Sequence, residues 1–328
     1  MKVPTFKQSG KSFTLNLKKG VDVLKRPQTP TGPFPYSEEE IEFVNEKAGA
    51  TLAGTLVIPE GATSSTPVIV MVTGSGLQDR NEELFEHKPF MVIADHLARY
   101  GIATLRYDDR SFGKSHGGDI LNATTIDFME DARAGIDYLR KRGGFGKIGV
   151  LGHSEGASIA FMLGASKDAD FVISLAGIGE KGDIALCAQA NKVLELSGID
   201  QRLSVEQYRL NALSAGDKWT EWFLNYDPKN DIKACSCPVF AVNGDKDVQV
   251  ISSVNLPYIE SVHGSGKNNF IMEYPGLNHL FQHSLLDEAS NTGSGAESYN
   301  VLAEYRKNEE TFSVEVLDDL VNWVDRIK

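Results

Sequence analysis

The residues best suited to chemistry lie in one short segment, Gly152-His153-Ser154-Glu155-Gly156. An apolar run typical of a buried strand leads into Gly152, and a helical pattern over Ala157 to Leu163 follows. In a strand–turn–helix setting, Gly-x-Ser-x-Gly forms a sharp, strained turn that holds the serine hydroxyl clear of the sheet. Both glycines are needed because side chains there would collide with the backbone of the turn. Ser154 is therefore the predicted nucleophile, in a nucleophile elbow.

A serine hydroxyl becomes a good nucleophile only when a base accepts its proton and a third group orients that base. In this architecture the partners follow the serine in the order acid, then histidine, each after a later strand. His279 comes five residues after a predicted strand that ends at Tyr274, so it is the expected base. His283, one helical turn further on, is the alternative. His263 precedes that strand at the far end of a helix, which places it at the wrong edge of the sheet.

The acid is expected after the predicted strand over residues 238–242, where Asp245 and Asp247 follow the turn glycine Gly244. Asp247 is better placed to reach the histidine. Asp245 is more suited to shaping the turn. The sequence thus predicts a catalytic triad of Ser154, Asp247 and His279.

The tetrahedral oxyanion of acyl transfer needs two preorganised N–H donors, and loss of one commonly costs ~10²–10³ in rate. One expected donor is the Glu155 N–H, because it directly follows the nucleophile and opens a helix whose N-terminus attracts negative charge. The other is expected in the glycine-containing loop after the strand over residues 68–72. Ser75 is the preferred residue there, with Gly76 as the alternative.

Strands and helices that could position these residues alternate through most of the chain. Apolar runs predict buried strands, and a spacing of three to four residues between apolar positions predicts helices. A hairpin precedes this alternation, and the pattern argues for an α/β fold with a mostly parallel sheet covered on both faces by helices. The predicted strands cover residues 41–45, 51–58, 68–72, 102–107, 147–151, 171–175, 238–242 and 270–274, and the helices 90–100, 124–141, 157–163, 250–262 and 311–327.

The alternation is interrupted once, at about residues 178–234, where three helical patterns follow one another (184–196, 205–213 and 218–224). An insertion there would lie over the carboxyl ends of the strands, where open α/β sheets bind ligands. We interpret it as a helical cap. Trp219, Trp222 and Phe223 are candidates to line an apolar substrate pocket, with simple packing of the cap as the alternative.

Residues 1–36 differ from the rest of the chain. Residues 10–19 alternate as a half-buried strand does, and four prolines between Pro27 and Pro35 predict an extended linker. The strand has no partner of its own in this interpretation. It either docks on the domain over residues 37–328 or ends a further N-terminal domain.

Composition excludes several classes of function. The net charge of −12 argues against nucleic-acid binding. No stretch approaches the ~18 apolar residues of a membrane span, and the first thirty residues lack the apolar centre of a signal peptide. The three cysteines do not have the spacing of a zinc site, so they are interpreted as structural, and neither metal nor cofactor is expected.

One further cluster surrounds Asp109 and Arg110, close to Gly113-Lys114-Ser115. The last three residues resemble part of a phosphate-binding loop, but the upstream glycine is absent, which excludes nucleotide binding. Asp109 and Arg110 are instead expected to brace the loops around the elbow through ion pairs.

Taken together, these motifs resemble the bacterial carboxylesterases of the α/β-hydrolase superfamily, in the group of serine-aminopeptidase-like and acyl-thioesterase-like hydrolases. The resemblance implies the α/β-hydrolase fold and the triad Ser154, Asp247 and His279. Thr73 stands where such proteins usually carry His, and the stretch 284–300 is longer than usual. The segments that carry the resemblance are Gly74-Ser75-Gly76 with Gln78-Asp79-Arg80, Asp108-Asp109-Arg110 with Gly113-Lys114-Ser115, the elbow, residues 244–250 and residues 277–282.

Residues 1–30 resemble the end of an N-terminal domain that secreted relatives carry. That likeness implies a longer, exported natural protein, in the periplasm or outside the cell, and the cytoplasm is the alternative.

The expected function is hydrolysis of small acyl esters through an acyl-enzyme, with a small-molecule ester as the partner. A peptidase or an acyl thioesterase on the same fold is the alternative, and acidic cap residues (Glu195, Asp200 and Glu206) could then anchor a free amino terminus. A non-catalytic binding protein of this fold is a remote third possibility.

Overall fold

The computed structural model describes residues 5–8, 11–14, 23–285 and 301–328. Its centre is a nine-stranded sheet in the order β11-β10-β9-β8-β5-β6-β4-β3, with β7 paired to β4. The six strands from β11 to β6 along this order run parallel, whereas β3, β4 and β7 are antiparallel to their neighbours. The strand bounds are β3 Tyr36–Asn45, β4 Ala50–Pro59, β5 Val68–Val72, β6 Ala103–Tyr107, β7 His116–Gly117, β8 Ile148–His153, β9 Phe171–Leu175, β10 Val239–Gly244 and β11 Phe270–Tyr274.

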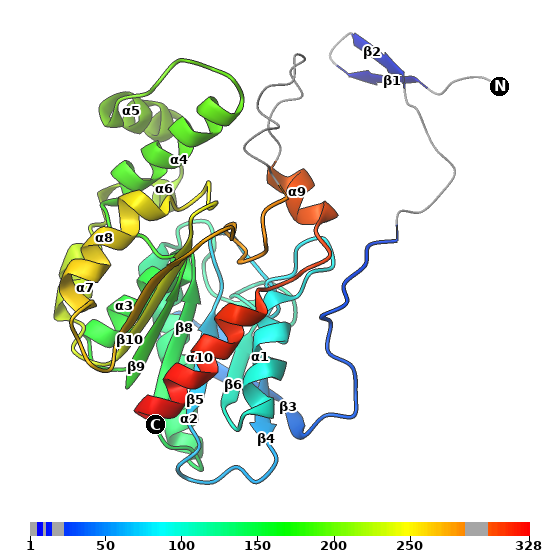
Figure 1. Ribbon diagram of the computed structural model, residues 1–328, viewed down its shortest axis with the longest axis vertical. Coiled ribbons are helices and arrows are strands. Elements are labelled where there is room, and N and C mark those ends of the chain that lie inside the picture. The colour runs from blue at the N-terminus through cyan, green and yellow to red at the C-terminus, as the bar shows by residue number, and fades with distance from the viewer. Residues whose placement is uncertain (1–4, 9–10, 15–22, 286–300) are drawn as a thin grey trace.

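Helices cover both faces of the sheet, as the uninterrupted apolar strands require (Figure 1). One face packs against α1 (Pro89–Arg99) and α10 (Val314–Ile327). The other packs against α2 (Thr125–Arg142), α3 (Glu155–Ala165), α7 (Lys229–Ala234) and α8 (Ser252–His263). This is the α/β arrangement that the alternating pattern predicts.

The insertion between β9 and β10 contains the three predicted helices, α4 (Gly182–Leu196), α5 (Val205–Ala215) and α6 (Lys218–Asn225). The shorter α7 was not predicted, because six residues carry too little periodicity to detect. The short strand β7 and the helix α9 (Val301–Lys307) were also missed. Most of the long stretch at 284–300 lies outside the described residues.

The prediction of an unpartnered strand near the N-terminus is wrong. Strand β2 (Lys11–Thr14) pairs antiparallel with β1 (Thr5–Gln8), which the pattern analysis did not detect. Residues 15–19 of the predicted strand lie outside the described part of the chain.

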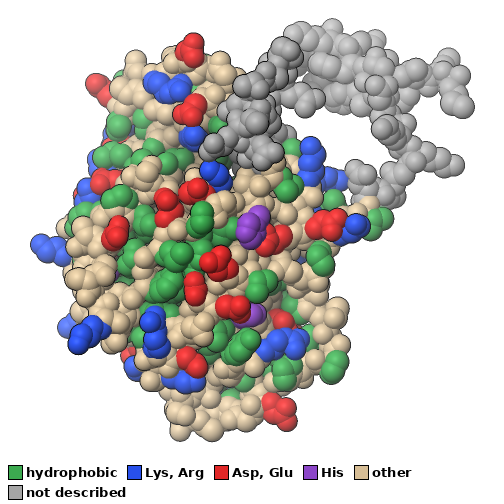
Figure 2. All heavy atoms as spheres, in the orientation of Figure 1, with side chains coloured by type: hydrophobic (Ala, Val, Ile, Leu, Met, Phe, Trp, Pro, Cys, Tyr) green, Lys and Arg blue, Asp and Glu red, His purple; other side chains and the backbone are tan. Residues whose placement is uncertain are grey.

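Acidic and basic side chains are interspersed on the face of the molecule that Figure 2 shows. Within the described residues, no helix combines the length and the apolar character needed to cross a membrane.

Candidate active site

Ser154 occupies a strained turn between β8 and α3, with φ 55° and ψ −115°. The φ value lies in the left-handed region that few side chains adopt. A Cβ at Gly152 would stand 1.9 Å from the Gly156 carbonyl oxygen, and one at Gly156 would stand 2.2 Å from the Val72 carbonyl oxygen. The steric reason given for both glycines is therefore confirmed.

His279 and Asp247 are joined by a hydrogen bond of 2.7 Å between Nδ1 and Oδ2, and both side chains are buried. The other carboxylate oxygen of Asp247 accepts hydrogen bonds from the backbone N–H groups of Gln249 (2.7 Å) and Val250 (2.9 Å). The carboxylate is thus held from three sides. Because it only accepts, His279 Nδ1 carries the proton, and Nε2 remains for another partner.

The alternative residues have other partners. His283 is exposed and pairs with Glu310 at 2.9 Å. Asp245 accepts a hydrogen bond of 2.6 Å from the Gly276 N–H, a contact that shapes the turn. His263 Nε2 lies 2.8 Å from the Ile232 carbonyl oxygen, far from these loops in the fold.

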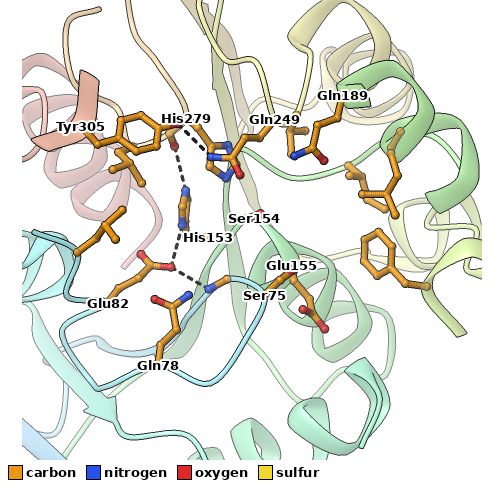
Figure 3. Close-up of a pocket in the computed structure, with 18 of the residues that line it drawn as sticks. Ser75, Gln78, Glu82, His153, Ser154, Glu155, Gln189, Gln249, His279 and Tyr305 are labelled. Carbon is orange, nitrogen blue, oxygen red and sulfur yellow. Dashed lines mark hydrogen bonds and ion pairs between the residues drawn. The ribbon is translucent and has the colours of Figure 1, made fainter. Parts of the chain in front are cut away.

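Ser154 and His279 line a common cavity of about 520 Å³ (Figure 3). Ser75 and Glu155, from the loop after β5 and from the start of α3, lie on the same wall. The remaining wall is largely apolar, and helices α4, α6 and α9 contribute to it. Its apolar members are Leu77, Leu84, Ile178, Ala185, Leu186, Trp219, Phe223, Val250, Leu280 and Leu302.

Two of the three predicted aromatic residues face this cavity. Trp219 and Phe223 line it and stack on each other, with ring centroids 4.9 Å apart. Trp222 does not: its ring stacks on Tyr226 and lines a separate hollow beside α7. Trp222 and Phe223 are adjacent in the sequence of α6, and adjacent residues of a helix point in different directions.

The loop after β5 approaches Ser154 closely. A Cβ at Gly74 would stand 3.2 Å from the Cβ of Ser154. The Gly74 N–H already donates to Glu82 Oε1 at 2.8 Å, so the N–H of Ser75 is the next donor along this loop. Gly76, with φ 91°, lies in a small hollow beside Asp109 instead of the main cavity.

The carboxyl group of Glu155 is buried beside the cavity. Burial raises its pKa, and hydrogen bonds from Thr125, Trp219 and Ser75 lower it in part. Thr125 Oγ1 and Trp219 Nε1 donate to the same oxygen, at 2.6 Å and 2.7 Å. Glu155 therefore ties α2, the cap helix α6 and the loop after β5 to the elbow.

The expectation that Asp109 forms an ion pair is wrong. Burial raises its pKa to about 8, and it accepts hydrogen bonds from the Gln78 N–H (2.8 Å) and Thr73 Oγ1 (3.3 Å). Arg110 does form a buried ion pair, with Asp131 of α2 at 2.7 Å. Both residues brace loops near the elbow, but Asp109 does so as a hydrogen-bond acceptor.

Two residues near the site were not predicted. His153 Nδ1 lies 2.8 Å from Glu82 Oε1, and His153 Nε2 lies 2.9 Å from the carbonyl oxygen of His279 (Figure 3). His153 stands inside the elbow motif, and its titratable side chain was a signal that could have been used. Glu82 lies in a loop without periodicity, so nothing in its sequence context pointed to it.

No group of three or more His, Cys, Asp or Glu residues suited to holding a metal ion occurs among the described residues.

Comparison with known proteins finds similar sequences and folds among hydrolases. Residues 86–196 match the family described as "Serine aminopeptidase, S33". Esterase EstD of Thermotoga maritima is 27% identical over 245 residues, which are 70% of this chain. The chain spans 58% of the length of this curated relative.

Solved structures of low sequence identity share the fold. The Pyrococcus furiosus esterase Pf2001 superposes with a TM-score of 0.57 at 16% identity, over 94% of this chain and 99% of that one. Est1E from Butyrivibrio proteoclasticus, solved with ferulic acid, gives a TM-score of 0.53 at 19% identity, over 73% of this chain and 90% of that one. The chain therefore has the α/β-hydrolase fold, and its sequence is similar to an esterase and to the serine aminopeptidase family.

Proposed function

We propose that this protein is a serine hydrolase that cleaves small carboxylic esters through an acyl-enzyme intermediate. The observation that carries the proposal is the buried His279–Asp247 pair, whose imidazole opens on the same cavity as Ser154. A serine, a histidine and a carboxylate in this order along an α/β fold form a general device for acyl transfer.

In the proposed reaction, Ser154 Oγ attacks the ester carbonyl carbon while His279 Nε2 takes the hydroxyl proton. Asp247 holds the imidazole in the required tautomer and stabilises its cation. The backbone N–H groups of Ser75 and Glu155 stabilise the oxyanion. Collapse of the tetrahedral intermediate expels the alcohol, which takes the proton from Nε2. Water, activated by the same imidazole, then releases the carboxylic acid and restores Ser154.

The cavity supports a small, largely apolar acyl group. Its volume of about 520 Å³ lies in the range of small-molecule sites, and its wall is dominated by aliphatic and aromatic side chains. Trp219 and Phe223 offer a stacked aromatic surface on the cap side. The names of the esterases to which the chain is similar agree with an ester substrate.

A peptidase receives less support, because the cap acids suggested as anchors do not line the cavity. Glu195 pairs with Lys192 at 2.9 Å, and Asp200 and Glu206 are exposed. Side-by-side assays of acyl esters, acyl thioesters and aminoacyl anilides would separate the three reactions.

The test uses p-nitrophenyl acetate and a fluorophosphonate probe. The wild type should hydrolyse the ester and be labelled, whereas Ser154→Ala should lose labelling and several orders of magnitude in kcat. A Ser154→Ala variant that keeps its activity would disprove the assignment. A series of acyl chain lengths would then define the acyl preference.

A further inference from the structure

His153 presents both ring nitrogens to groups that can only accept hydrogen bonds. Nε2 faces the carbonyl oxygen of His279 at 2.9 Å, and Nδ1 faces Glu82 Oε1 at 2.8 Å. A carbonyl has no proton to give, so Nε2 must be the donor. Glu82 Oε1 also accepts the Gly74 N–H at 2.8 Å, as a carboxylate would. With Nδ1 donating as well, His153 is an imidazolium paired with a carboxylate.

This ion pair is inside the protein, because each side chain is only 7% exposed. Burial opposes the charge on His153, but the Glu82 carboxylate, the His279 carbonyl and the Asp247 carboxylate together outweigh burial and raise the pKa of His153 above its usual value. A buried pair is costly unless its remaining hydrogen-bonding capacity is used. Here the bonds to the Gly74 N–H and the His279 carbonyl use part of that capacity.

Glu82 reaches this position from an unusual backbone conformation, with φ 53°. Such conformations are rare for residues with a side chain, and they concentrate at functional sites. Its own N–H donates to the Asp79 carbonyl at 2.9 Å, which closes the turn that aims the carboxylate inward. The loop is therefore shaped to deliver Glu82 to His153 and Gly74.

The bonds form one continuous chain across the site, which Figure 3 shows from Glu82 through His153 to His279. One end is Gly74, which lies against Ser154 and precedes the expected oxyanion donor Ser75. The other end is the main chain of His279. The ring centroids of His153 and His279 also lie 4.7 Å apart.

We propose that the His153–Glu82 ion pair is a positioning unit that fixes the main chain of His279 and the loop after β5 relative to Ser154. The proposal rests on the hydrolase function proposed above. Neither His153 nor Glu82 takes part in a bond-making or proton-transfer step. Both act by holding His279 and the loop after β5 in position.

The position of the two bonds on Glu82 makes glutamine an informative substitute. Gly74 and His153 both donate to the same oxygen, Oε1. In Glu82→Gln, an oxygen there would leave a charged His153 without a counter-ion. An NH₂ group there would instead face the Gly74 N–H as a second donor. This variant keeps the volume of the side chain but cannot keep both hydrogen bonds together with the negative charge.

The experiment is a double-mutant cycle in the full chain with Glu82→Gln, His153→Phe and the double variant, measured with p-nitrophenyl acetate. His263→Phe is the matched control. His263 is equally buried, stacks on an aromatic ring (Phe161) and bonds a backbone carbonyl, but lies outside the site. Circular dichroism confirms folding, and Glu82→Gln keeps the test open if the apolar substitution fails to fold.

Each single variant should lose about 10- to 100-fold in kcat with KM changed by less than about threefold, because misplaced catalytic groups slow the chemistry more than they weaken binding. The double variant should be no slower than the slower single one, because the two residues act as a unit. His263→Phe should keep its kcat. Folded single variants with unchanged kcat, or losses that multiply in the double variant, would overturn the proposal.

Failure of the underlying function gives a different result. In that case the wild type itself would not hydrolyse the ester, or Ser154→Ala would be as active as the wild type. An active wild type with an inactive Ser154→Ala leaves the function intact, so the cycle then tests only the ion pair.

Discussion

The indole N–H of Trp219 donates a 2.7 Å hydrogen bond to the carboxyl group of Glu155, the residue that directly follows the proposed nucleophile Ser154. A cap helix, α6, is therefore attached to the start of α3, whose first N–H is the expected oxyanion donor. This attachment couples the wall of the cavity to the reacting centre. The role of this hydrogen bond can also be tested separately from the apolar contacts of the Trp219 ring.

Trp219→Phe should preserve most of the stacking on Phe223 but remove the bond to Glu155. We expect a loss of about 1 kcal/mol in the free energy of unfolding, because a buried acceptor loses one of its donors. We also expect kcat/KM to fall by about tenfold, the equivalent of ~1.4 kcal/mol in transition-state stabilisation. Chemical denaturation and steady-state kinetics measure the two effects.

The control for this change is Trp222→Phe, in the same helix, where the ring faces the separate hollow beside α7. Its kcat/KM should stay within about twofold of the wild type. Equal kinetic losses in both variants would show that the hydrogen bond to Glu155 has no special role.

Asp247→Asn should reduce kcat by about 10⁴-fold, because an amide can donate to His279 Nδ1 and hold the wrong tautomer. Asp245→Asn tests the neighbouring carboxylate, which accepts a hydrogen bond from the Gly276 N–H and forms an ion pair with Lys246 at 3.4 Å. It should change kcat by less than about threefold. If Asp245→Asn proved the more damaging change, the assignment of the acid would be reversed.

The sequence predicted the fold well because the buried strands are continuous apolar runs. β5, β9 and β11 begin and end where the pattern placed them. The elbow was equally accessible, since its two glycines are required by contacts within the turn itself.

The parts of the site that the sequence did not predict depend instead on contacts between distant segments of the chain. Glu82 reaches His153 across 71 positions of the sequence, and Trp219 reaches Glu155 across 64. Tyr305 and Leu302 enter the cavity wall from a helix far along the chain. Local periodicity carries no information on such pairings. The error on Trp222 has a different, local cause, since it is adjacent to Phe223 in α6 and adjacent residues of a helix point in different directions.

The buried carboxyl group of Asp109 should make stability depend on pH. Its pKa rises from an ordinary 3.8 to about 8 in the folded state. Between pH 3.8 and about pH 8, the folded protein holds a proton on Asp109 that the unfolded chain has released. Binding of this proton favours the folded state, so its contribution to the free energy of unfolding is complete below the lower pKa and is lost as pH rises toward the higher one. Above about pH 8 the loss is complete.

Asp109→Asn removes this titration and can still accept the hydrogen bond from Gln78. The free energy of unfolding, measured by urea denaturation from pH 5 to pH 8, should fall more steeply in the wild type than in the variant. The variant should thus gain stability relative to the wild type as pH rises. Parallel curves would mean that Asp109 is ionised throughout this range.

Arg26 fastens the segment before β3 to two segments near the cavity, the loop at Phe85 and the C-terminal end of α9. Its guanidinium donates to the carbonyl oxygen of Phe85 at 2.8 Å and 3.0 Å, to that of Asn308 at 2.9 Å and to that of Arg306 at 3.1 Å. These two segments adjoin Leu84 and Tyr305, which line the cavity. The segment therefore helps to hold two parts of the wall together.

Arg26→Ala should lower the free energy of unfolding by about 2 kcal/mol, since hydrogen bonds to a charged donor contribute more than neutral ones. Lys25→Ala is the matched control, because its ammonium forms only an exposed ion pair with Glu309, with side chains 72% and 57% exposed. Exposed pairs contribute little, so we expect a change within about 0.5 kcal/mol. Urea denaturation of both variants measures the difference. Equal losses would mean that the contacts of Arg26 are as weak as a surface ion pair, and that the segment before β3 does not support the cavity wall.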